Sequence, residues 1–345
     1  MEHCNPIYIT INKEKLKYNI QHSFELCKEK SINLAVVTKS ICADACIIDI
    51  INQSQATTIA DSRIDNLSKI DTKKTKLLIR PAAPQEADSV VSCCDMSFVT
   101  EFSTLQALEA ACKAQNLTHD VLLMIDLGDL RDGIMYTDTE HIMNLAKYTH
   151  ESKHLRLSGI ATNYNCFLGY LPDKQNMNIL AEIHKELTPL YDTDTPVVSG
   201  GNSSSVSLLT GDSDILSDEV NQFRMGEAVM LGRDPADNTL IPGYEYDVFT
   251  LYVPLIEVQA KPIIENGVQS EMRRGILAVG KQDVQIEHLL PRDSRLTLLG
   301  GCSDECVIDL SAAPEYKVGD TISFDLEYGA LMTAFVSPFI SRKYI

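Results

Sequence analysis

Short apolar runs alternate with amphipathic segments through about the first two thirds of the chain, and this alternation constrains the fold more than any other feature. Eight of the runs are candidate strands because polar or turn-forming residues bound each of them. They cover residues 34–38, 57–60, 77–80, 96–99, 121–126, 155–161, 196–199 and 221–225. Apolar residues at helical spacing lie between the runs and before the first one. The clearest sets are Phe102, Leu105, Leu108 and Cys112, and Leu16, Ile20, Phe24 and Cys27.

Eight strand and helix units over about 230 residues predict a closed (β/α)8 TIM barrel rather than an open sheet. From about Tyr244 onward the pattern becomes rich in β-type alternation, and residues 232–243 before it are rich in turn formers. The alternating stretches cover residues 249–257, 275–279, 295–299, 306–310 and 321–326. We therefore expect an α/β barrel over residues 1–235 followed by a C-terminal all-β domain over residues 236–345.

Composition narrows the range of partners. The 345 residues include 30 Lys and Arg against 48 Asp and Glu, which gives a net charge of −18. This acidic excess without a basic run disfavours nucleic acid and anionic membranes as partners, whereas a small cationic substrate is compatible with it. The ten scattered cysteines indicate reduced thiols rather than disulfides or a metal site, and we find no signal peptide or membrane span. We expect a cytoplasmic protein without a bound metal.

The polar residues that end the apolar runs are the first candidates for chemistry, because the active site of a parallel barrel lies at the carboxyl ends of its strands. Lys39 directly follows the run at residues 34–38. A lysine there can simply extend its amine into water. A desolvated lysine, however, has a depressed pKa and can form a Schiff base with an aldehyde.

Two later segments predict a phosphate site. Residues 199–205 read SGGNSSS, in which glycines allow a close backbone approach and serine hydroxyls can bind phosphate, although a helix cap would need only one serine. Residues 221–233 read NQFRMGEAVMLGR, with Arg224 at the end of a run and Gly226 in the next turn. Barrels often bind phosphate after the seventh and eighth strands, so the two segments support each other.

These residues together resemble the pyridoxal-phosphate enzymes of the alanine racemase fold (fold type III), and within them the alanine/ornithine racemase branch. The resemblance covers nearly the whole chain. Besides the two phosphate segments it is carried by VVTKSIC (36–42), IADSRIDNL (59–67), LMIDLGDLRDG (123–133), GIATNYNC (159–166) and EYGALMTAFVSPFISRKY (327–344). It implies pyridoxal 5'-phosphate as cofactor, an amino acid as substrate, and a homodimer whose subunits share each active site.

The resemblance also implies roles for individual residues. Lys39 would hold the cofactor covalently and act as one of the two bases that move the α-proton. Arg131 would help to place the substrate carboxylate, and Arg224 would face the pyridine nitrogen. Because a guanidinium does not readily lose its proton, that nitrogen would stay unprotonated and the carbanion short-lived, which suits racemisation. The other implied cofactor contacts are Asn163, Asn202, Ser203, Ser204, Gly226, Glu227 and Tyr328.

The chain departs from alanine racemases proper at several positions. Met124 stands where a lysine that becomes carbamylated is often found, and Asn163 stands where a histidine packs against the cofactor ring. The segment at residues 261–272 looks short and lacks the tyrosine that serves as the second base. Cys166 could replace that base, although a structural thiol is the commoner role. The other candidates are Tyr244, Tyr246, Asp283, Ser303 and Asp304.

Acidic residues around Arg131 point to the substrate class. Asp129 and Asp132 flank it where alanine racemases carry apolar or small residues, so a carboxylate could meet the ammonium of ornithine or lysine. Solvated surface acids would give the same pattern, and Arg131 could simply pair with one of them. Arg63 could contact the substrate or pair with Asp61. The remaining candidate substrate contacts are Cys166, Ser303 and Asp304.

The sequence thus predicts a pyridoxal-phosphate-dependent racemase of ornithine, of another basic amino acid, or of alanine. Two alternatives stay open. A cofactor carrier without turnover would explain the unassigned second base, and a decarboxylase or aldolase of related fold would use the same barrel.

Overall fold

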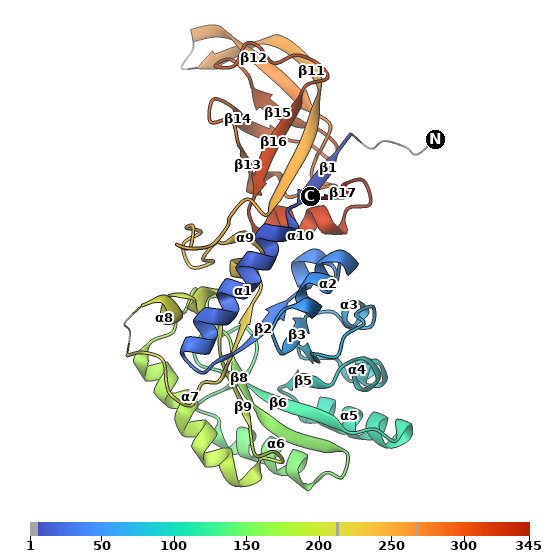
Figure 1. Ribbon diagram of the computed structural model, residues 1–345, viewed down its shortest axis with the longest axis vertical. Helices are drawn as coiled ribbons and strands as arrows, with labels where there is room; N and C mark the ends of the chain where they lie inside the picture. The colour runs from blue at the N-terminus through green and yellow to red at the C-terminus, as the bar shows by residue number, and fades with distance from the viewer. Residues whose placement is uncertain (1–5, 212–213, 266–267) are drawn as a thin grey trace. The chain divides into compact units, whose positions relative to one another are not determined.

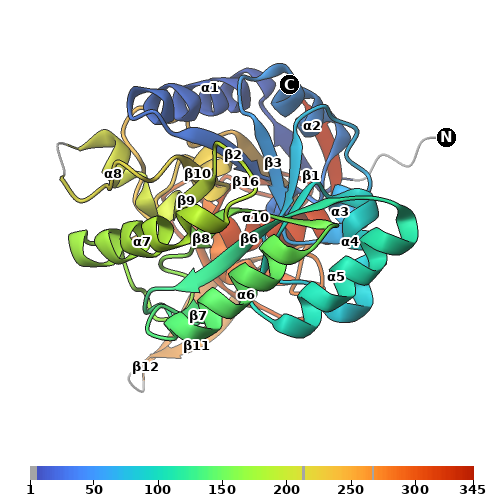
Figure 2. The same ribbon diagram turned by 90° about the horizontal axis from the view of Figure 1, so that it is seen from below.

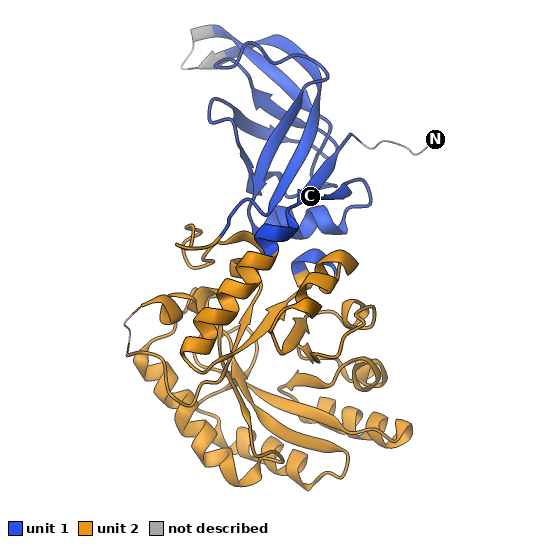
Figure 3. Ribbon diagram, in the orientation of Figure 1, with its two compact units in different colours: residues 1–16, 40–42, 245–345 blue, residues 17–39, 43–244 orange. Residues whose placement is uncertain are grey.

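The computed structural model describes residues 6–211, 214–265 and 268–345, and these divide into two compact units (Figure 3). The barrel unit consists of Lys17–Lys39 and Ala43–Tyr244. The β unit consists of the described part of Met1–Leu16, together with Ser40–Cys42 and Glu245–Ile345. No helix in the described ranges is both long and apolar enough to cross a membrane. The domain limits expected from the sequence, 1–235 and 236–345, stay a prediction.

The barrel unit is a closed barrel of parallel strands (Figure 2). Its strands pair in the order β5, β4, β3, β2, β10, β9, β8 and β6, and pairing between β5 and β6 closes the sheet. Each strand overlaps one predicted apolar run, so the predicted barrel is confirmed. Within the described residues the eight barrel strands are β2 (Asn33–Val37), β3 (Thr58–Asp61), β4 (Thr75–Leu78), β5 (Met96–Val99), β6 (His119–Asp126), β8 (Leu155–Thr162), β9 (Val197–Asn202) and β10 (Gln222–Met225).

Helices lie on the outside of these strands (Figures 1 and 2). Helix α5 shows why, because Leu105, Leu108 and Cys112 form one fully buried face at helical spacing, whereas Phe102, the fourth member of the predicted apolar set, is 38% exposed. The helices of the described chain up to the last barrel strand are α1 (Lys13–Glu29), α2 (Ala45–Gln53), α3 (Ile64–Leu67), α4 (Ala87–Cys93), α5 (Phe102–Gln115), α6 (Thr139–Glu151), α7 (Lys174–Leu187) and α8 (Ser207–Thr210). The short helix α9 (Glu227–Leu231) follows β10.

Side chains from several strands fill the barrel as a packed core. The cluster includes Met124, which has no exposed surface, so this residue packs in the interior. Its other buried members are Val37, Ala60, Leu77, Met96, Phe98, Leu122 and Ala161. The strand ends above this core are therefore the place where polar groups can meet.

The β unit is antiparallel apart from one pair of strands. The predicted alternating stretches fall on strands β11 (Phe249–Glu265), β12 (Val268–Leu277), β14 (Thr297–Gly301), β15 (Cys306–Asp309) and β16 (Thr321–Leu326). The sequence did not predict β1 (Tyr8–Ile11), β13 (Leu289–Pro291) or β17 (Ser341–Tyr344). Strand β1 pairs antiparallel with β11 and parallel with β17, so both ends of the chain contribute to this sheet. Helix α10 (Tyr328–Val336) precedes β17.

The segment at residues 261–272, which looks short in the sequence, forms the far part of the β11–β12 hairpin. Its ladder pairs Lys261 with Met272 and Glu265 with Val268. Residues 266 and 267 lie outside the described residues. The predicted loss of the second base from this segment stays a prediction.

A buried histidine at the amino end of the barrel makes folding stability sensitive to acid. The imidazole of His119, at the start of β6, is fully buried and forms a hydrogen bond through Nε2 with Ser97 Oγ at 2.8 Å. Burial lowers the pKa of His119 from its ordinary value of 6.5 to about 4. Between these two values the unfolded chain binds this proton and the folded chain does not, so stability falls as the pH falls.

We expect the free energy of unfolding to drop by roughly 3 kcal/mol through this group between about pH 6.5 and pH 4. His119→Gln should remove that part of the acid dependence, because glutamine does not titrate. Urea unfolding at a series of pH values measures both chains, with His150→Gln, a change at a more exposed imidazole, as the control. Equal acid slopes for His119→Gln and the wild type would contradict the prediction.

Candidate active site

Lys39 lies just beyond the carboxyl end of β2, at the first position of the short 3-10 helix η1 (Lys39–Ile41). Burial lowers the pKa of its amine below the ordinary lysine value, and the positive charge of Arg131 lowers it further. The thiol of Cys166 acts in the opposite direction. The amine is therefore easier to deprotonate than that of a solvated lysine, as expected from its place after a buried strand.

A buried carboxylate, which the sequence analysis considered only as a partner of Arg63, lies beside the residue that precedes Lys39. Asp61, the last residue of β3, accepts hydrogen bonds from Thr38 Oγ1 at 2.6 Å, from Asn66 Nδ2 at 3.1 Å and from the backbone amide of Arg63 at 2.9 Å. Burial raises the pKa of Asp61, although these hydrogen bonds oppose the rise. The exposed Arg63 thus meets Asp61 through its backbone. In the sequence, Asp61 directly follows the apolar run at residues 57–60. That position, at the end of a predicted strand, was the signal that could have marked it as a candidate site residue.

The predicted phosphate segments do come together. The hydroxyl of Ser203, which opens the 3-10 helix η4 (Ser203–Ser205) after β9, accepts hydrogen bonds from the amides of Gly226 at 3.0 Å and Ala228 at 3.3 Å. A Cβ atom on Gly226 would lie 3.1 Å from Val37 Cβ, so a larger residue there would press on β2. Ser203 and Ser204 are both buried. Two backbone amides and a hydroxyl therefore converge beyond β9 and β10.

Arg224 is almost completely buried near the end of β10, and hydrogen bonds hold its guanidinium. Nη1 donates to the carbonyl and hydroxyl oxygens of Ser199, and Nη2 donates to the Thr162 carbonyl and to Asn163 Oδ1. The ring of Phe98 lies 5.2 Å from the guanidinium carbon. Burial lowers the pKa of Arg224 to about 10, which leaves it charged at neutral pH. The acceptors thus come from β8, β9 and the residue after β8.

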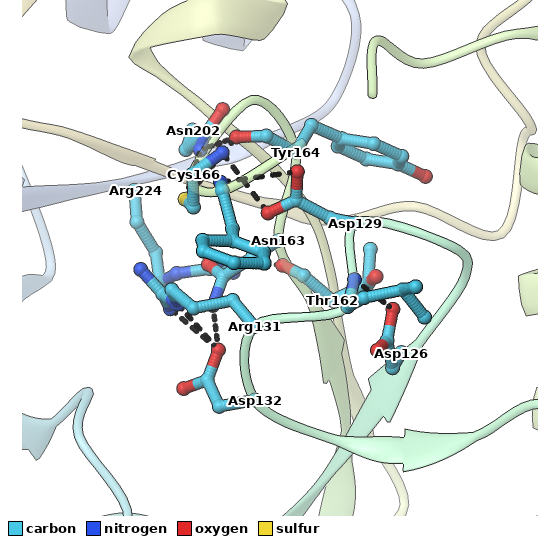
Figure 4. Close-up of polar contacts among 12 residues, drawn as sticks. Asp126, Asp129, Arg131, Asp132, Thr162, Asn163, Tyr164, Cys166, Asn202 and Arg224 are labelled. Carbon is cyan, nitrogen blue, oxygen red and sulfur yellow. Dashed lines mark hydrogen bonds and ion pairs between the residues drawn. The ribbon is translucent and has the colours of Figure 1, made fainter. Parts of the chain in front are cut away.

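Three aspartates, one at the end of β6 and two in the loop after it, have separate tasks (Figure 4). Asp126 Oδ1 accepts from the amides of Gly128 and Leu130 and so shapes the loop itself. Asp132 Oδ1 accepts a hydrogen bond from Arg131 Nε at 2.7 Å and forms an ion pair with Arg131 Nη2 at 2.6 Å. Of the two pairings considered for this arginine, the structure has the one with Asp132.

The third aspartate, Asp129, holds a neighbouring loop. Its carboxylate, only 2% exposed, accepts hydrogen bonds from the amides of Cys166 at 2.9 Å and of Phe167 and Leu168 at 3.3 Å each. Three amide donors and deep burial give this carboxylate a structural task. Its contact with a substrate ammonium stays a prediction.

Cys166 and Asn202 also lie at this end of the barrel (Figure 4). Asn202 Nδ2 donates to the Tyr164 carbonyl at 2.7 Å and approaches Cys166 Sγ at 3.7 Å. Burial raises the pKa of the Cys166 thiol, while the charges of Arg131 and Lys39 oppose the rise. The thiol is therefore close enough to Arg131 and Lys39 for their positive charges to act on its pKa.

Three predicted site residues belong to the β unit. Tyr328 is the first residue of α10, and Ser303 and Asp304 are exposed in the turn between β14 and β15. Their contacts with substrate or phosphate stay predictions, as does the amide contact of Glu227. Tyr244, considered as a second base, is buried in the barrel unit, where its hydroxyl forms a 2.8 Å hydrogen bond with Ser23.

Comparisons with known proteins agree with this geometry. Residues 11–234 match the family model described as alanine racemase, N-terminal domain. The chain is 36% identical to the ornithine racemase of Acetoanaerobium sticklandii, over 98% of this chain and 99% of that protein. It is 26% identical to the lysine racemase of Thermotoga maritima, over 97% of this chain and 98% of that protein.

A solved structure gives the same fold at low sequence identity. The alanine racemase of Clostridium difficile 630 superposes with a TM-score of 0.75 at 15% identity and covers all of this chain and 97% of its own. The match of the family model and the identity to the ornithine racemase lead to one conclusion. This chain belongs to the alanine racemase family.

Proposed function

We propose that this protein is a pyridoxal-phosphate-dependent racemase that interconverts the L and D forms of ornithine or of another basic amino acid. The observation that carries the proposal is the position of Lys39, a partly buried amine of lowered pKa at the end of a barrel strand. Similarity along 98% of the chain to a protein named ornithine racemase supports the substrate class. Similarity to a protein named lysine racemase supports it independently.

The donors at the strand ends fit the groups of pyridoxal phosphate, the cofactor of the alanine racemase family. The amine of Lys39 suits the aldehyde, and the charged Arg224 suits the ring nitrogen. The Ser203 hydroxyl and the two amides that donate to it, those of Gly226 and Ala228, lie together where the phosphate would bind. When bound, the cofactor would supply the electron sink that acidifies the α-proton of an amino acid.

The side chains around this cofactor site have properties that racemisation needs. A general base must be unprotonated at the working pH, and burial favours the neutral amine of Lys39. Arg131 uses Nε and Nη2 on Asp132, and no hydrogen bond found in the described ranges uses its Nη1. That nitrogen suits a substrate carboxylate. Arg224 keeps its charge at neutral pH, which supports an unprotonated pyridine nitrogen.

The second acid/base stays unassigned. Cys166 suits proton donation better than proton removal, because its raised pKa keeps the thiol protonated at neutral pH. Ser303 and Asp304 in the β unit stay predicted substrate contacts. If no amino acid exchanges its α-proton, the alternative of a cofactor carrier without turnover takes the lead.

An exposed apolar surface on the barrel unit supports the proposed homodimer. Asp129 bonds to the amides of Cys166, Phe167 and Leu168, and Tyr170 packs against Gly128, so two neighbouring loops form one surface. This apolar loop patch consists of Leu130, Phe167, Leu168, Tyr170 and Leu171, each at least 37% exposed. Exposed apolar patches on ordered loops commonly bind another protein, and a second copy of the chain is the proposed occupant. The cytoplasmic location expected from the sequence stays a prediction.

Lys39→Ala should abolish racemisation, with a loss of at least about a thousandfold, because it removes both the attachment point and one base. NMR in heavy water would follow α-proton exchange of L-ornithine, L-lysine, L-alanine and L-serine, and chiral chromatography would detect the D form. Lys185→Ala, which removes an exposed amine paired with Glu219, should stay fully active. Undiminished exchange in Lys39→Ala would overturn the assignment, and carbon dioxide or an aldehyde product would identify a different reaction.

Covalent loading of the apoprotein with pyridoxal phosphate should speed up as the pH rises, with a midpoint below the ordinary lysine pKa of 10.5. The sign follows from burial, which disfavours the ammonium and increases the fraction of reactive amine at any given pH. Initial rates of attachment can be measured by absorbance from pH 6 to pH 10, with a free N-acetylated lysine as the reference. A midpoint equal to that of the reference would contradict the prediction.

Removing two side chains of the apolar loop patch should weaken the dimer. Replacing Phe167 and Leu168 together by serine should raise the dissociation constant more than about tenfold, since each buried apolar side chain contributes about 1.5–3 kcal/mol. Sedimentation velocity over a range of concentrations measures it. Leu117→Ser, an exposed position outside the patch, is the control. A wild type that stays monomeric, or a double variant that associates as the wild type does, would argue against this interface.

A further inference from the structure

Four side chains form one continuous line of hydrogen bonds across the candidate site (Figure 4). Asp132 Oδ1 accepts hydrogen bonds from Arg131 Nε at 2.7 Å and from Asn163 Nδ2 at 3.0 Å, and it forms an ion pair with Arg131 Nη2 at 2.6 Å. Asn163 Oδ1 then accepts from Arg224 Nη2 at 2.8 Å. One carboxylate and one amide thus connect an arginine in the loop after β6 with an arginine in β10.

The orientation of Asn163 makes this connection directional. A side-chain amide has a donor end and an acceptor end, so it can serve a carboxylate and a guanidinium only one way round. Its nitrogen has to face Asp132 and its oxygen has to face Arg224. Because Arg224 is also held by Ser199 and by the Thr162 carbonyl, the amide is fixed from the buried side. A displacement of Asp132 is therefore transmitted to the contact with Arg224.

The carboxylate also offsets repulsion among the cations of the site. Arg131 disfavours the charge on Lys39 and on Arg224, because like charges repel at short range. Asp132 favours the charge on Arg224. Without this carboxylate, Arg131 would keep its repulsion towards both groups and lose its hydrogen-bonded anchor.

We propose that Asp132 is a positioning residue for the racemisation put forward above, and the proposal rests on that function. Through Arg131 it orients the guanidinium that places the substrate carboxylate, and through Asn163 it fixes a contact of the arginine that faces the cofactor ring. Asp132 itself touches none of the reacting atoms. Its role is to hold the guanidinium groups of Arg131 and Arg224 in fixed positions relative to each other.

An ordinary exposed ion pair is the competing interpretation, and the barrel contains a matched example. Arg156 Nε and Asp120 Oδ1 are 2.6 Å apart, at the amino ends of β8 and β6. Such a pair contributes little to stability by itself. The pair formed by Arg131 and Asp132 differs because a third donor, Asn163, ties it to a buried arginine. Asp120→Asn is therefore the control for Asp132→Asn.

Kinetics of the cofactor-loaded protein provide the first arm of the test. Asp132→Asn should raise KM for L-ornithine about tenfold, because a charge-assisted anchor of Arg131 is lost, while kcat falls less than about threefold. Asp132→Glu, which keeps the charge, should recover part of the loss. Asp120→Asn should leave both constants unchanged. A purely structural role would lower the active fraction, and hence kcat, without changing KM, and that result would overturn the proposal.

Arginine-selective 15N NMR of the apoprotein provides a second arm that requires no activity. Asp132→Asn should shift the side-chain signals of both Arg131 and Arg224, whereas Asp120→Asn should shift only that of Arg156. An active wild type in which Asp132→Asn leaves the Arg224 signal and KM unchanged would overturn the positioning role. An inactive wild type whose Arg224 signal still responds would overturn the proposed function, and the role in racemisation with it, while the physical link would stand.

Discussion

A fully buried guanidinium has to be surrounded by acceptors, and Arg224 imposes this requirement on the mouth of the barrel. It lies near the end of β10 and obtains its acceptors from Ser199 on β9, Thr162 at the end of β8 and Asn163 just after it. Leaving even one of these donors unpaired would cost about 1–3 kcal/mol or more for a charged group. The carboxyl ends of β8, β9 and β10 must therefore lie at the same level along the barrel. The loops that follow these strands then start from fixed positions.

Because the loops start from fixed positions, their polar side chains can form an ordered site at the carboxyl ends of the barrel strands. Residues with the same side chain take on different tasks according to the neighbour that the strand order provides. Asp126 shapes its own loop, Asp129 holds the next loop, and Asp132 anchors Arg131. At this end of the barrel, several acidic residues therefore stabilise the structure itself. They cannot all be counted as contacts for a basic substrate.

Much of the fold follows from local pattern, because a buried parallel strand needs an apolar run and a surface helix needs an apolar face. The eight barrel strands and the lysine beyond β2 were accessible in this way. Contacts between distant residues were not. Thr38 with Asp61 and Ser199 with Arg224 depend on which strands become neighbours, and the link through Asn163 depends on a side-chain orientation. Strand β1 was missed because only Asn12 separates it from helix α1, so no segment of turn-forming residues marks the end of the strand.

The pairing of β1 with β17 affects how the chain can fold as it is made. Residues 8–11 are made about 330 residues before one of their partner strands, at residues 341–344. At a synthesis rate of roughly 5–20 residues per second, the first strand waits on the order of half a minute for that partner. The barrel strands between them can pair as they emerge. The sheet that contains β1 and β17 therefore cannot be completed until all of the barrel strands have been made.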